Sequence, residues 1–178
     1  MTASKINVAT AAGCVGVTSN VATGTGLPLG IPDLGNSSVT FAVTKPAGCG
    51  SVADVNLTFN VAHTVGADLT FELTDPAATT VMLLVNNPAG PWADSNNGFP
   101  GITLDDEAAN LIPDCFTSPN GTGCSAGDML TGSYRPHNAL SGFDTHAGNG
   151  TWTLKISDKL GSNTGTINSA SIFITWAP

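Results

Sequence analysis

The chain has 178 residues, a formal net charge of −8 at pH 7, and only 10% charged residues. This acidic balance disfavours nucleic acid and anionic membranes as partners, because both are bound through basic patches. No apolar run reaches the roughly eighteen residues of a membrane-spanning helix. The abundance of Gly, Thr, Ser and Asn is typical of short strands joined by turns and argues against long helices.

Alternation of apolar and polar residues predicts strands along the whole chain. The segment from Lys5 to Val21 has the small residues of a first strand. Alternating runs follow at residues 39–43, 55–61, 69–73 and 102–104, with a continuous apolar run at 81–85. The clearest alternation lies at residues 152–156 and 172–176, on either side of a loop containing Gly161, Asn163 and Gly165. We expect these last two runs to form a wide antiparallel hairpin that closes the fold.

The number and spacing of these runs predict an all-β fold, a β-sandwich of about eight or nine mostly antiparallel strands. No linker or change of composition divides the sequence. We therefore expect a single domain over residues 1–178, with residues 1–30 as an N-terminal extension, including the first strand, packed on it. The only helical candidate is one short turn at residues 105–110.

The four cysteines are Cys14, Cys49, Cys115 and Cys124, which allow three disulfide pairings. Cys115 and Cys124 bracket a loop rich in Gly, Pro and Asn, while Cys14 and Cys49 both lie beside Gly in the N-terminal third. We therefore expect each cysteine to pair with its neighbour along the chain. Four free, buried cysteines are the alternative. Disulfides would indicate a secreted protein, since they persist in oxidising compartments; a cytoplasmic protein is the alternative.

The sequence contains no recognisable catalytic motif. A serine hydrolase needs a nucleophile held against a histidine that an acid orients. The histidines are His63, His137 and His146, and none accompanies a G-x-S-x-G elbow or an H-E-x-x-H zinc motif. We therefore expect this chain to be no enzyme by itself.

A calcium site is the metal site that the sequence best supports. Asp105, Asp106 and Glu107 concentrate three carboxylates at the end of a strand, and a bound cation is the usual relief of such repulsion. Calcium prefers carboxylate and carbonyl oxygens. Asp68 opens a strand and Asp158 ends one, and strand ends can converge in a sandwich. We predict calcium ligands from all five residues; a solvated loop or a capped turn is the alternative.

Three further residues are candidates for surface contacts. Trp92 lies in a loop, where an aromatic side chain can stack on a sugar, pack on a partner or pack back on the domain. Arg135 is the only arginine and follows Tyr134. We expect Arg135 to form a structural ion pair with an acid of the 105–107 loop, and a binding role for it is secondary.

Four motifs, in order, make the chain resemble the P domain (Homo B domain) of proprotein convertases and bacterial subtilisin-like proteases. They are IPD at 31–33, HTVGADL at 63–69, DDEA at 105–108, and TGSYRPHNALSGFDTHAGNG at 131–150 followed by TWTLKISD. The resemblance runs from Ile31 to Trp176. It departs at Ala67, where the family often has Gly before the aspartate, and at the cysteine-bearing segment between Pro113 and Met129.

The resemblance implies a jelly roll and a non-catalytic accessory domain of a secreted subtilisin-like serine protease. Such a domain packs on the protease catalytic domain, supports its folding and stability, and in some cases attaches to a substrate or surface or tunes calcium or pH dependence. In this pattern His63 caps or braces a turn. We expect the chain to be a monomer. The alternative function is that of a free-standing extracellular binding or adhesive jelly-roll module with a carbohydrate or protein ligand, because fold similarity does not fix function.

Overall fold

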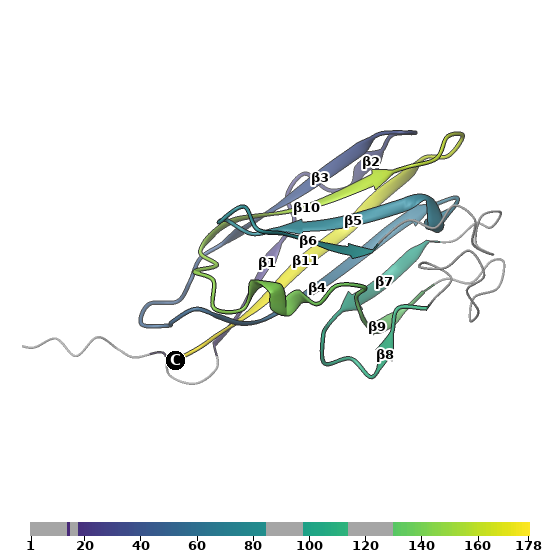
Figure 1. The fold of residues 1–178 in the computed structure, drawn as a ribbon. Coiled ribbons are helices and arrows are strands. Elements are labelled where there is room, and N and C mark those ends of the chain that lie inside the picture. Colours follow the sequence, from purple (N-terminus) through teal and green to yellow (C-terminus); the bar gives the residue numbers. More distant parts are fainter. Residues whose placement is uncertain (1–13, 15–17, 85–97, 114–129) are drawn as a thin grey trace, which may run out of the picture.

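The computed structural model describes residues 14, 18–84, 98–113 and 130–178 (Figure 1). Within them lie two short 3-10 helices, η1 (Gly66–Asp68) and η3 (Leu140–Phe143). The described strands are β1 (Thr18–Thr23), β2 (Leu29–Ile31), β3 (Asn36–Val43), β4 (Val52–His63), β5 (Leu69–Thr74), β6 (Thr80–Leu84), β7 (Phe99–Leu104), β8 (Asn110–Leu111), β9 (Gly132–Arg135), β10 (Gly150–Asp158) and β11 (Gly165–Trp176). No helix in this part of the chain is long and apolar enough to cross a membrane.

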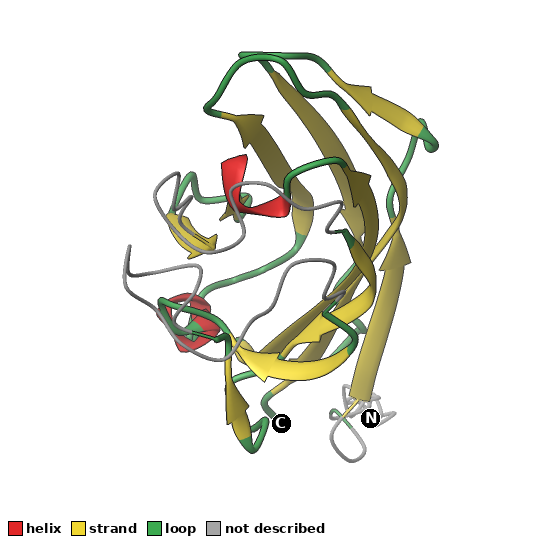
Figure 2. Cartoon of the chain, turned by 90° about the vertical axis from the view of Figure 1, so that its right-hand side faces the viewer, coloured by secondary structure: helices red, strands yellow, loops and turns green. Residues whose placement is uncertain are grey.

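The strands form two sheets, and strands dominate the cartoon in Figure 2. The large sheet has the order β1-β11-β4-β7-β9-β8, with β2 also paired to β11, and the small sheet has the order β3-β10-β5-β6. All pairings are antiparallel except those of β9 with β7 and with β8. The predicted all-β sandwich is confirmed. It has more strands than predicted because β2 and β8 are too short to show an alternation.

The core lies between the sheets and follows the alternation in sequence. In β4, the inward residues from Val55 to Val61 are almost fully buried, and the residues between them point outward. Phe59, Phe71 and Phe99 meet at 4.8–5.9 Å between ring centroids. Burying one such side chain stabilises a fold by about 1.5–3 kcal/mol, so these rings hold the two sheets together.

The predicted C-terminal hairpin is wrong. β10 lies in the small sheet between β3 and β5, whereas β11 lies in the large sheet between β1 and β4. Period-two alternation shows that each strand has a buried face but not which strand it pairs with. The loop after Asp158 therefore crosses from one sheet to the other, and Trp152 and Trp176 are buried on opposite layers.

Cys14 and Cys49 form the predicted disulfide, across a sequence separation of 35 residues. On the loop-closure model a bridge of this span stabilises the fold by about 4 kcal/mol. It ties the N-terminal segment to the turn between β3 and β4, where the N–H of Cys14 also donates to the Gly48 carbonyl at 3.3 Å. Cys115 and Cys124 lie outside the described residues.

Candidate functional site

One end of the sandwich gathers buried polar side chains. β4 ends at His63, η1 ends at Asp68, β10 ends at Asp158, and the following loop contains Asn163. Strand pairing brings these ends together, because Gly165 of β11 lies opposite His63 and Asp158 lies opposite Leu69. We call His63, Asp68, Asp158 and Asn163 the buried network.

His63 lies at the centre of the buried network, and its side chain is 0% exposed, as is that of Asp158. Val65 contacts Nδ1 of His63 through its carbonyl oxygen, at 2.6 Å, and through its N–H, at 3.1 Å. The shorter contact requires a proton on Nδ1. Nε2 lies 3.4 Å from Oδ2 of Asp158. Both atoms are buried, and neither has a hydrogen-bond partner among the described residues.

Asp68 is the second buried carboxyl of the network, with 2% of its surface exposed. Its Oδ2 accepts from Nδ2 of Asn163 at 3.3 Å, and Oδ1 of Asn163 accepts from Oγ1 of Thr64 at 2.7 Å. Burial and the neighbouring Asp158 raise the pKa of Asp68, whereas His63 and Asn163 lower it. These hydrogen bonds join the turn after β4 to Asp68 and to the loop after β10.

A second group of acids, Asp54, Asp105, Asp106, Glu107 and Asp144, forms what we call the acidic cluster. Burial raises the pKa of Asp54, and the charge of Asp105 raises it further. A hydrogen bond with Asp105 raises the pKa of Glu107. The pKa of Asp144 is raised by burial and then by Asp106, although His146 lowers it. These carboxyls repel one another when they are ionised.

Asp106 has a structural partner at the start of η3. Its Oδ1 accepts from the N–H of Leu140 at 2.9 Å, and its Oδ2 accepts from the N–H of Ser141 at 2.8 Å. Oδ1 of Asp105 accepts from the N–H of Glu107 at 2.8 Å. Carboxylates in these positions satisfy donors that a helix start or a turn leaves open. Asp106 thus acts as a cap, which was the alternative to its role as a calcium ligand.

The structure does not bring the five predicted calcium ligands together. Asp105 follows Leu104, which pairs with Leu57 in the middle of β4, whereas Asp68 and Asp158 lie at the His63 end of that strand. The reason is that β7 begins opposite Val61 and runs antiparallel to β4, away from the His63 end, so that its last residue lies opposite Leu57. In the described part of the chain, no group of three or more His, Cys, Asp or Glu residues is arranged to hold a metal ion.

The predicted surface residues have mixed positions. Tyr134 lies in β9, is partly buried against the core, and its carbonyl accepts from the N–H of Asp105 at 3.0 Å. Arg135 is exposed, and among the described residues no ion pair joins it to the 105–107 loop. Trp92 lies outside the described residues.

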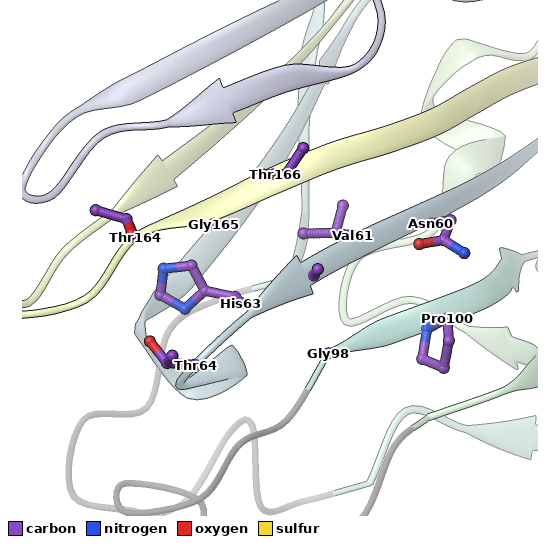
Figure 3. A pocket seen from close by; sticks show the side chains of 10 residues that line it. Asn60, Val61, His63, Thr64, Gly98, Pro100, Thr164, Gly165 and Thr166 are labelled. Atoms are coloured by element: carbon purple, nitrogen blue, oxygen red, sulfur yellow. The ribbon is translucent and has the colours of Figure 1, made fainter.

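A hollow of about 330 Å³ opens at the end of β4, on the outer face of the large sheet (Figure 3). Its floor is made of small residues, Ala62, Gly98 and Gly165. A Cβ at Gly98 would lie 2.8 Å from the Val61 carbonyl oxygen, and one at Gly165 would lie 2.5 Å from that of Ala62. A side chain at either glycine would collide with the β4 backbone, so both glycines let their segments lie close against this strand. It is lined by Asn60, Val61, Ala62, His63, Thr64, Gly98, Pro100, Thr164, Gly165 and Thr166.

Sequence reasoning did not find Asp54, Asp144 or the hollow. Asp54 and Asp144 are distant from the 105–107 loop in sequence, and only strand register and the position of η3 bring them near it. Glycines alternating with threonines around residue 165 were the one sequence signal for a surface with few side chains.

Comparison with known proteins gives a match in fold alone. No family model matches the sequence, and no curated protein sequence matches it. The structure is similar to a serine protease of Aeromonas sobria, with a TM-score of 0.52 and 18% identity over 90% of this chain and 26% of that chain. The same protease in complex with the chaperone ORF2 gives a TM-score of 0.51 and 18% identity over 91% of this chain and 27% of that chain. The chain thus spans about a quarter of the length of these structures.

Proposed function

We propose that the chain is a non-catalytic accessory domain of a secreted, subtilisin-like serine protease, where it supports the folding, stability or attachment of a catalytic domain. The observation that carries this proposal is the fold match, in which 90% of this chain corresponds to part of a serine protease chain. The four P-domain motifs support the same assignment. The Cys14–Cys49 disulfide supports an extracellular location, since such bonds persist in oxidising compartments.

The environment of two histidines supports the lack of a catalytic role. His63 is buried, with its ring nitrogens directed at Val65 and Asp158. His146 places Nδ1 2.7 Å from Oδ2 of Asp75, and its side chain is 30% exposed. This pair has the form of the acid and base of a triad. In the described part of the chain, however, no Ser or Thr hydroxyl is hydrogen-bonded to the His146 ring.

The isolated chain is expected not to hydrolyse peptides, because the residues that the structure describes place no Ser or Thr hydroxyl in a hydrogen bond with the His146 ring. The measurement is incubation with casein and with fluorogenic peptides, beside subtilisin as a positive control. The variant His146→Gln removes the partly exposed base that is paired with Asp75. Activity that co-purifies with the chain and is lost in this variant would contradict the proposal.

We keep calcium as a proposal at the acidic cluster alone, where the carboxyls lie near one another although no three of them are already arranged as metal ligands in the described residues. The raised pKa values of Asp54, Glu107 and Asp144 support it, because they indicate that ionisation is unfavourable in the fold. The stability that these groups contribute is present below the ordinary carboxyl pKa and is lost as the pH rises through the raised pKa values. A cation that neutralises the cluster therefore has its largest effect near neutral pH.

We expect calcium to raise the melting temperature at neutral pH by several degrees. A ligand that binds only the folded state adds about 2.7 kcal/mol at a hundredfold excess over Kd, which is worth several degrees for a domain of this size. Melting curves in EDTA and in millimolar calcium measure the effect. Asp105→Asn should remove most of the gain, and Asp33→Asn, outside the cluster, should retain it. Coincident curves for the wild-type chain would show that the calcium prediction is wrong.

A further inference from the structure

We propose that the outer face of the large sheet, from the hollow beside Ala62 to Phe173, is a binding surface for a neutral polysaccharide. This goes beyond the accessory role and does not rest on it, because the surface belongs to this chain alone.

The hollow exists because two irregularities in strand pairing meet at Asn60. The register with β7 shifts between Phe59 and Asn60, and the register with β11 shifts at Asn168. Opposite Asn60, β7 presents Pro100, which has no N–H to donate. Bulges bend a strand and are frequent beside binding sites. Here they curve the sheet around Ala62, whose small side chain leaves the space open.

The lining offers neutral hydrogen-bonding groups. Figure 3 shows Thr64 and Thr164 at one end of the hollow and Asn60 at the other, with Thr166 between them, where it pairs with Ala62. Nδ2 of Asn168 donates to Oδ1 of Asn60 at 2.9 Å, a bond that leaves the amide N–H groups of Asn60 as donors. His63 lines the hollow, but its side chain is 0% exposed. Among the described lining residues no charged side chain is exposed, whereas the neutral ones offer a hydroxylated ligand both donors and acceptors.

A row of hydroxyl side chains continues the surface across five strands. Each residue of the row pairs with the next one on the neighbouring strand. In this order the residues are Thr23, Ser171, Thr58, Thr103 and Ser133. The hydroxyls of Thr58 and Thr103 are 2.9 Å apart. Neighbouring strands lie about 4.8 Å apart, so the row extends for about 19 Å. It offers repeated hydrogen bonds on a flat face, which suits a repeating ligand.

An exposed aromatic side chain lies at the far end of the same face. Phe173 is 36% exposed and pairs with Val21, which is 59% exposed. A ring in this position can contact the apolar face of a sugar. From Thr166 to Phe173 the surface is about 23 Å long at strand rise, which matches a polymer better than a single sugar. A peptide would instead seek an open strand edge, and this surface is a face.

The test is retention of the whole chain on microcrystalline cellulose, chitin, starch and insoluble xylan, with alginate beads and gelatin as anionic and peptide comparators. We expect retention on at least one neutral polysaccharide, unchanged by high salt because no ion pair is involved. Ala62→Phe fills the hollow from an exposed position and should weaken retention about tenfold or more. Thr58→Val, which removes a hydroxyl and preserves shape, should also weaken it.

The matched control is Ala53→Phe, the same substitution at an exposed position of the same strand, nearer its other end. The Ala53→Phe variant should be retained as strongly as the wild-type chain. Melting curves check that each variant is folded. Three results would overturn the proposal: retention on none of the neutral polysaccharides, preference for alginate or gelatin, or wild-type retention of both Ala62→Phe and Thr58→Val.

Discussion

Replacement of His63 by leucine is expected to lower the free energy of unfolding by about 3–5 kcal/mol at neutral pH. The reason is that His63 is the only group of the described buried network that can be positively charged, and its Nε2 lies 3.4 Å from Oδ2 of Asp158. Leucine fills a similar space, but it leaves the carboxyls of Asp158 and Asp68 buried without the histidine side chain beside them. A buried charge that loses its partner costs far more than the pair itself contributes.

Urea unfolding of a double-mutant cycle separates this electrostatic effect from lost packing. Asp158→Asn in the His63→Leu background should recover a large part of the loss, because neutral partners of similar shape remove the unpaired charge. Burial and Asp158 raise the pKa of Asp68 while His63 lowers it, so loss of His63 raises that pKa further. The loss of stability in His63→Leu is therefore complete at pH values above the raised pKa of Asp68, and it becomes smaller as the pH falls through that pKa. No recovery in the double variant would show that the pair is not ionic.

The layers of the fold were predictable because burial in a strand has a period of two. The run from Val55 to Val61 alternates in sequence and is buried alternately in β4. The same holds from Trp152 to Ile156 in β10. The Cys14–Cys49 bridge was also predicted, from its place beside glycines in the N-terminal third.

The pairing of the strands was not predictable from this alternation. β10 and β11 both carry a clear apolar face, and nothing in either strand states that the two belong to different sheets. The register of the strands also determines which carboxyl groups lie close together, because it separates Asp105 from Asp158 and brings Asp54 near the 105–107 loop. A local run of charges therefore identified part of the acidic cluster but placed the wrong aspartates beside it.

The hollow shows a further limit of sequence reasoning. It is lined in part by Gly98, just before β7, and by Gly165, at the start of β11, which approach β4 from its two sides. Glycine in a sequence suggests a turn first. Only the structure shows that both glycines here let their segments lie close against the β4 backbone.

Removal of this domain from its natural full-length protein tests the accessory role most directly. We expect that protein to be secreted and to carry a serine protease catalytic domain. Without residues 18–176, its kcat/KM for a short fluorogenic peptide should stay the same, because we propose that the domain has no catalytic role. Its half-life at elevated temperature should fall about tenfold or more, since each 1.4 kcal/mol lost from the unfolding barrier is tenfold in rate. A natural protein without a protease domain, or an unchanged half-life, would contradict the account.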